Sequence, residues 1–232
     1  MKYLMIIVLC AIIGFISDSA VARGLSHTVT PHGGLALPMG QFRQNSEEVN
    51  SGYAQVGFGG GVDYDLRFGT SGLCWSSGFT WMANDFEAEY FHHGLDVLLQ
   101  ESGSYSNYIF LTGLKYEIEF SDNLRLFAVA QGGGALSKGP YFNGYVDVEG
   151  DDLPYVEYQM GNDSSTGFAI GLGMVTNETT TVIIRFYSLS SLDYHAVAEY
   201  TQNSITQKAD VGWSQPVSII SLTVGYAIDL GR

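Results

Sequence analysis

The sequence is poor in cysteine and in basic side chains, and each scarcity excludes a class of protein. Of its two cysteines, Cys10 lies in the apolar amino-terminal stretch, so only Cys74 remains beyond it and no intramolecular disulfide is expected. Lys and Arg number 10 against 24 Asp and Glu, which gives a net charge of −14. Nucleic-acid binding, which needs clustered basic residues, is therefore not expected.

Long apolar runs are also missing beyond the amino terminus. Residues 1–22 have the features of a secretory signal peptide: Lys2, an apolar run over Tyr3–Ile16 and the cleavage sequence Ala20-Val21-Ala22. After them there is no run of about eighteen apolar residues, so no transmembrane helix is expected. We expect residues 23–232 to form one domain.

Alternation of apolar and polar residues is what the sequence has instead. In Tyr108–Phe120 every second residue from Tyr108 is almost wholly apolar, while the intervening residues end in Gly113, Lys115, Glu117 and Glu119. Alternate side chains of a β-strand point to opposite faces, so one face suits lipid and the other a polar interior. The stretch is also longer than the about 9–11 residues that cross a bilayer as a tilted strand.

The alternation recurs in eight stretches and predicts an all-β fold. We expect an eight-stranded antiparallel up-and-down transmembrane β-barrel with four long outer loops and three short periplasmic turns, an arrangement that places both termini in the periplasm. A soluble lipocalin-type barrel is the rival, but here the charged residues share the small, glycine-rich face. The expected strands are Gly33–Phe42, Gly52–Phe68, Leu73–Asp85, Tyr108–Phe120, Leu124–Lys138, Ser164–Thr176, Thr181–Tyr194 and a last strand after Ser214.

Three segments carry a resemblance to a known family. They are GGLALPMGQF (Gly33–Phe42), GLKYEIEFSDNLRLFAVAQGGG (Gly113–Gly134) and SLTVGYAIDL (Ser221–Leu230). They resemble the small outer-membrane β-barrels of Gram-negative bacteria, such as the OmpA membrane domain, OmpX and OmpW. The resemblance implies a monomer in the outer membrane of a Gram-negative bacterium, in contact with membrane lipid and lipopolysaccharide and inserted by the barrel-assembly machinery.

Nine charged residues fall on the inward face, most of them in the periplasmic half of the barrel. Because buried charges are paired or coordinated, they predict an ion network that plugs the lumen. A gated polar path is the alternative interpretation. The nine are Asp63, Asp65, Arg67, Lys115, Glu117, Glu119, Arg125, Arg185 and Asp229.

The outer half of the interior is expected to be lined by glycines. These glycines either relieve crowding in the curved wall or leave a pocket open to the outside, the second being what a resemblance to OmpW implies. Two prolines bear on the same region, because Pro38 and Pro216 lie at the outer ends of the first and last strands. Proline donates no ladder hydrogen bond, so they define a possible lateral seam; simple tolerance at strand ends is the alternative.

Function is less well defined than fold. We expect a non-enzymatic structural or surface-interaction scaffold without metal or cofactor. One alternative is an OmpW-like passive transporter of small or hydrophobic solutes; another is a lipid-modifying enzyme that uses a histidine among His92, His93 and His195 and a serine among Ser102, Ser104 and Ser190. Acidic loop residues such as Asp147, Glu149, Asp151 and Asp152 could bind lipopolysaccharide through cations, although their spacing matches no calcium loop.

Overall fold

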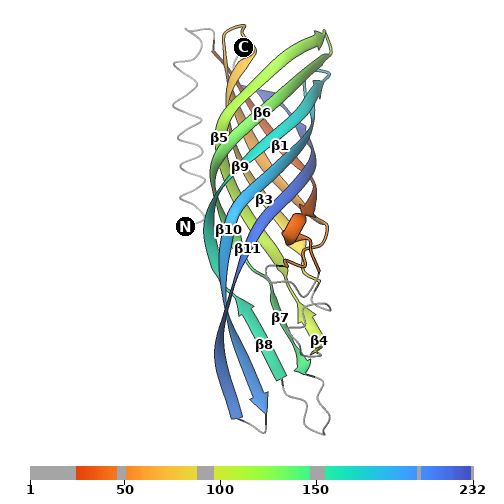
Figure 1. The fold of residues 1–232 in the computed structure, drawn as a ribbon. Coiled ribbons are helices and arrows are strands. Elements are labelled where there is room, and N and C mark those ends of the chain that lie inside the picture. The colour runs from red at the N-terminus through yellow and green to blue at the C-terminus, as the bar shows by residue number, and fades with distance from the viewer. Residues whose placement is uncertain (1–24, 46–50, 88–96, 147–154, 203–204, 231–232) are drawn as a thin grey trace.

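The computed structural model describes residues 25–45, 51–87, 97–146, 155–202 and 205–230, which form a closed antiparallel β-barrel (Figure 1). Its wall has eight strands, and the closing contact joins β1 to β11. The expected eight-stranded barrel is thus confirmed. The wall strands are β1 (Leu25–Met39), β2 (Gly57–Phe68), β3 (Leu73–Asp85), β5 (Ser104–Ser121), β6 (Leu124–Lys138), β9 (Asn162–Thr176), β10 (Thr180–Gln202) and β11 (Ile205–Tyr226).

The first strand begins at Leu25 rather than at Gly33 and ends at Met39, where a short 3-10 turn, η2 (Gly40–Phe42), follows. The early segment pairs with β2 from Leu25 opposite Phe68 onward. His27, Pro31 and His32 obscure the alternation in this segment of the sequence, although the ladder accommodates them. The earlier start brings His32 into the interior, where only 2% of its side chain is exposed.

Pro31 coincides with a gap in the closing ladder between β1 and the end of the chain. β11 pairs with β1 as far as His32 opposite Gly225, and a two-residue strand, β12 (Ile228–Asp229), resumes the same register at Val29. Proline has no N–H to donate at the intervening position. Ala227 donates its backbone N–H to Thr179 in the β9–β10 turn instead (2.7 Å).

Short turns join the strands at one end of the barrel. Residues 69–72 connect β2 to β3, with Gly69 and Gly72 at φ values of 60° and 73° that glycine adopts without strain. Asp122 and Asn123 join β5 to β6, and residues 177–179 join β9 to β10. The three short turns lie where the alternation predicts them.

An apolar belt surrounds the wall. On β9, Ile170 is 53% exposed and Leu172 is 69% exposed, and the outward side chains of Phe168 and Met174 are exposed as well. The outward faces of the other strands repeat the pattern, so the surface is apolar where a water-soluble barrel is polar. Within the described ranges, no helix has the length and apolar character needed to cross a membrane.

The opposite end extends well beyond the belt (Figure 1). β10 and β11 stay paired as far as Gln202 opposite Ile205, so the long loop expected over 195–214 is a hairpin extension instead. Three strands lie in the other expected loops: β8 (Tyr155–Met160) pairs with β10, β7 (Tyr141–Val146) with β8, and β4 (Val97–Ser102) with β7. The result is a five-stranded outer sheet of β11, β10, β8, β7 and β4.

Ile170→Arg tests whether the belt contacts lipid. In phospholipid vesicles the substitution is expected to lower the free energy of unfolding by about 2–4 kcal/mol, because a charge near the bilayer centre is costly on the lipid face. Urea unfolding followed by tryptophan fluorescence measures it. Ser164→Arg, an exposed position at the outer end of the same strand, is the matched control and should have little effect. Equal effects at the two positions would contradict a bilayer around the belt.

Candidate functional site

Seven of the nine predicted interior charges meet in two clusters inside the barrel. Alternation of side chains along each strand brings them to the inward face. β2 supplies Asp63, Asp65 and Arg67, β5 supplies Lys115 and Glu117, β6 supplies Arg125 and β10 supplies Arg185.

The lower cluster is centred on the carboxylate of Glu117. Lys115 Nζ lies 2.8 Å from its Oε1 atom, Arg125 Nη1 lies 3.2 Å from its Oε2 atom, and Arg67 also binds Oε2. Lys115 makes a second ion pair with Asp65 at 2.7 Å and lies 4.2 Å from the ring centre of Phe127. Three cations on one buried carboxylate offset the cost of removing these groups from water.

The upper cluster joins Arg185 to Asp63 at 2.8 Å. Arg185 also donates to the Tyr187 hydroxyl (3.0 Å), and His32 Nε2 lies 3.6 Å from Asp63. The sequence pattern does not indicate His32, because the expected first strand begins one residue later, at Gly33. Tyr187 carried a usable signal, since it follows Arg185 by two residues and so shares its face.

A cavity of about 10 Å³ lies between the two clusters. Asp65, Thr181 and Arg185 line it, and each has a buried side-chain atom without a hydrogen-bond partner among the described residues. The volume is that of one water molecule, and these atoms include both donors and acceptors.

Glu119 and Asp229 do not join the clusters. Both are exposed at the end with the short turns. Glu119 stands opposite Arg125 in the β5–β6 ladder, yet no ion pair within 4.0 Å links it to any residue that the structure describes. The lumen network therefore centres on Glu117, one step deeper along β5.

Aromatic side chains fill the outer half of the interior. Tyr105 packs against Phe42 (5.0 Å between ring centres), Phe86 (5.9 Å) and Tyr194 (6.0 Å), and all four rings are buried. Tyr105 also donates its hydroxyl to the Gly52 carbonyl (2.9 Å), which ties the first outer connection over the mouth. We call this group, with Tyr53, the aromatic cap.

The cap corrects two expectations about the first outer connection. Residues 52–56, part of the expected strand Gly52–Phe68, do not belong to β2, and Ala54 does not face lipid, because it is 2% exposed and forms a bridge to Phe86. The chain turns inward because Gly40 and Tyr53 adopt φ values of 56° and 51°. Lower in the wall, a Cβ atom at Gly113 would overlap the Ala130 carbonyl, so that glycine serves the close approach of β5 and β6.

The two prolines of the suggested seam do not meet. Pro38 is paired in register with Ile219, and the ladder continues to Met39 opposite Ser218. Pro216 lies beyond the end of β1, opposite an irregularity between Leu189 and Leu192 of β10. The interruption of the closing ladder is at Pro31, near the other end of the barrel.

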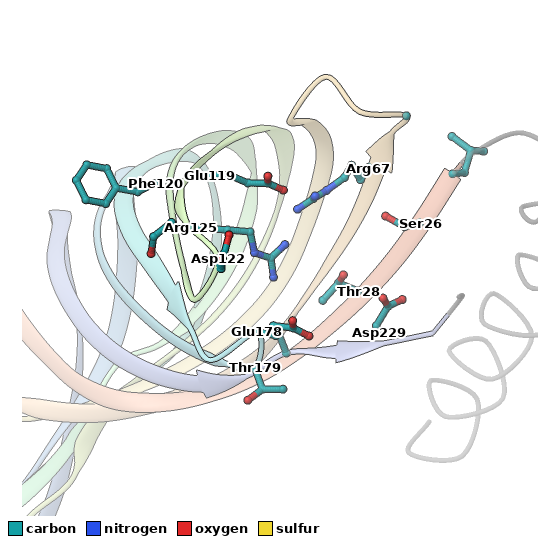
Figure 2. Close-up of a pocket in the computed structure, with 14 residues that line it drawn as sticks. Ser26, Thr28, Arg67, Glu119, Phe120, Asp122, Arg125, Glu178, Thr179 and Asp229 are labelled. Carbon is teal, nitrogen blue, oxygen red and sulfur yellow. The ribbon is translucent and has the colours of Figure 1, made fainter.

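A wide polar cavity opens at the end with the short turns (Figure 2). It measures about 1040 Å³, and we call it the vestibule. Arg67 and Arg125 reach it from the lower cluster, and Glu119, Asp122, Glu178 and Asp229 also line it. The sequence indicated charged residues here but not an open space. Among the described residues, no group of His, Cys, Asp and Glu is arranged to hold a metal ion.

Comparison with known proteins finds similar folds but no sequence match. No protein-family model matches the chain, and no curated protein matches it. Among the solved structures that the chain resembles are three bacterial proteins. Neisserial surface protein A (NspA) is 11% identical over 88% of this chain and 96% of its own, with a TM-score of 0.39. The outer membrane protein OprG from Pseudomonas aeruginosa is 10% identical over 90% and 99%, with a TM-score of 0.46. Ail, the attachment invasion locus protein of Yersinia pestis, is 11% identical over 89% and 99%, with a TM-score of 0.36.

Lys115→Met tests the lower cluster. Asp65 would lose its ion-pair partner in the interior, so the free energy of unfolding in vesicles should fall by about 3–5 kcal/mol. Arg125→Leu should cost less, because Glu117 keeps Lys115 and Arg67. Urea unfolding measures each loss.

Lys138→Met is the matched control, since Lys138 is exposed at the outer end of β6. Adding Asp65→Asn to Lys115→Met should recover part of the loss, because no carboxylate is then left unpaired. Equal stabilities for the Lys115 and Lys138 variants would contradict a structural ion network.

Proposed function

We propose that the chain is an integral outer-membrane β-barrel protein that serves as a non-enzymatic scaffold with a plugged lumen and presents its outer sheet to surface partners. The short turns and both termini would lie in the periplasm. The observation that carries the proposal is the double closure of the interior, with the ion clusters below and the aromatic cap above. The apolar belt supports placement in a bilayer, in contact with membrane lipid and lipopolysaccharide after insertion by the assembly machinery.

The outer sheet supports the interaction role. From Val217 back to Ile205, β11 pairs with β10 on one side and with no described strand on the other, although η2 also contacts β11. Exposed strand edges offer unpaired N–H and C=O groups to a partner strand. The sheet therefore presents a recognition surface away from the membrane. The acidic segment 147–154, suggested for cation-mediated lipopolysaccharide contact, lies outside the described residues.

Passive transport of small or hydrophobic solutes is the second candidate, and the vestibule favours it, since it provides an open polar entrance. Enzyme activity has less support. Ser104 donates to Asp85 (3.0 Å) and Ser190 to the Thr166 carbonyl (3.0 Å), so neither is bonded to a histidine in the described part of the chain. His92 and His93 lie outside the described residues.

Planar-bilayer conductance separates a plugged scaffold from a transporter. The mature protein is expected to show no discrete current steps, because the ion clusters and the aromatic cap both block the path. Vesicles of the same lipid provide the insertion control, with heat-dependent gel mobility reporting the folded barrel. Steps whose size scales with salt concentration would favour the transporter instead.

An epitope inserted directly after Gln202, which with Ile205 forms the last pair of the outer hairpin, tests the orientation. Antibody should label it on intact cells, because the hairpin extends away from the end with the short turns. The same epitope between Asp122 and Asn123 should be labelled only after permeabilisation. The reverse pattern would place the outer sheet in the periplasm and overturn the proposed role.

A further inference from the structure

The vestibule has a basic floor. Arg67 and Arg125 both donate to the Oε2 atom of Glu117, a carboxylate that also pairs with Lys115. A guanidinium carries five N–H donors, and the contact with Glu117 uses one nitrogen of each arginine. About a quarter of each arginine side chain is exposed (24% and 27%), on the vestibule side of the cluster. The floor therefore presents further N–H donors from two cations, with Cys74 beside Arg67 and the rim acids Glu119 and Glu178 acting on Arg125.

Charge in the interior also favours an anion at this floor. The two clusters hold three carboxylates, Asp63, Asp65 and Glu117, against four bases, Arg67, Lys115, Arg125 and Arg185. One positive charge is thus in excess within the two clusters, and the nearest further carboxylates that act on Arg125, Glu119 and Glu178, belong to the rim. A carboxylate is the natural acceptor for paired guanidinium groups.

The rim of the vestibule has the opposite sign. Four carboxylates line it, and all four are exposed: Glu119, Asp122, Glu178 and Asp229. Figure 2 shows Glu178 and Asp229 gathered with Thr179 on one side of the cavity, with Glu119 and Arg67 on the other. A simple dianion such as phosphate would have to pass these acids, and a simple cation would leave the arginine donors unused.

We propose that the vestibule binds a short zwitterionic peptide, with the peptide carboxylate at Arg67 and Arg125 and its ammonium group among the rim acids. Volume supports a peptide over a single amino acid, because about 1040 Å³ is at the upper end of the range for small-ligand pockets. Ser26, Thr28 and Thr179 line the walls and offer hydroxyls to peptide groups. The site lies at the end away from the outer sheet and does not depend on the scaffold role.

Trialanine is the probe. The mature chain, folded in detergent micelles and labelled for backbone NMR, is titrated with trialanine, with its carboxyl-terminal amide and with its N-acetyl derivative. Trialanine should shift the amide signals of Thr28, Gly69 and Thr179. Each derivative should bind at least about tenfold more weakly, because a hydrogen-bonded charge is lost. Equal affinity of the amide or of the acetyl form, or no shift at about 10 mM trialanine, would overturn the proposal.

Variants locate the two ends of the peptide. Arg125→Gln should weaken trialanine binding roughly tenfold and have little effect on the amide. Glu178→Gln, in a turn outside the ion clusters, should weaken trialanine but not the acetyl form, and so tests the site even if Arg125→Gln does not fold. Lys138→Gln and Asp85→Asn remove one positive and one negative charge at the outer end of the barrel, and they should leave trialanine binding unchanged. Weakening by these two controls would overturn the site.

Discussion

A backbone N–H or C=O group without water must find its partner inside the protein, and this requirement governs the whole structure. Pairing of β1 with β11 meets it by leaving no edge in the wall of the barrel. Closure with eight strands also sets the width, because such an interior is just wide enough to be filled by side chains. Every inward residue must then pack or pair with another inward residue.

The interior holds charged side chains near the end with the short turns and mostly apolar or aromatic side chains near the outer end. Along β5 the inward side chains pass from Tyr105 through Ile109 and Leu111 to Gly113, and then to Lys115 and Glu117. Charges near the wide vestibule retain contact with water through Arg67 and Arg125, which lowers the cost of burial. The other end closes with aromatic rings, and the buried hydroxyls of Tyr105 and Tyr194 are hydrogen-bonded to the Gly52 carbonyl and to Ser137.

Alternation made most of the wall predictable. The bounds of β3 and β6 are those expected from the sequence, because apolar residues recur at most of the alternate positions there. The outer hairpin was missed because polar and apolar residues do not alternate in the sequence of residues 195–214, and a strand without that alternation carries no period-two signal. The path of residues 53–56 was mispredicted for another reason. The alternation from Tyr53 to Val56 resembles that of a strand, although the backbone there lies outside the barrel wall.

The sequence predicted which charged residues face the interior better than it predicted which of them form ion pairs. Alternation selects inward residues such as Glu117 and Glu119 equally, yet depth in the barrel separates a buried acceptor of three cations from an exposed carboxylate. Partner choice between β2 and β5 depends on where inclined strands meet across the lumen, which no local pattern encodes. The vestibule was not predicted, because a cavity depends on how the strands and turns are arranged in three dimensions and no local sequence pattern encodes it.

Pro31 divides the ladder that closes the barrel, between β1 and the strands β11 and β12, into two parts of unequal length. Above it, the ladder is continuous from His32 to Met39; below it, β12 adds only the pairs at Thr28 and Val29 and the hydrogen bond from Leu230 to His27 (2.9 Å). A short ladder opens at a lower free energy than a long one. The β1–β12 pairing can therefore open locally while the β1–β11 ladder stays paired. Asp229 belongs to β12 and lines the vestibule. Local opening of the β1–β12 pairing would therefore change the mouth of the vestibule without opening the barrel wall.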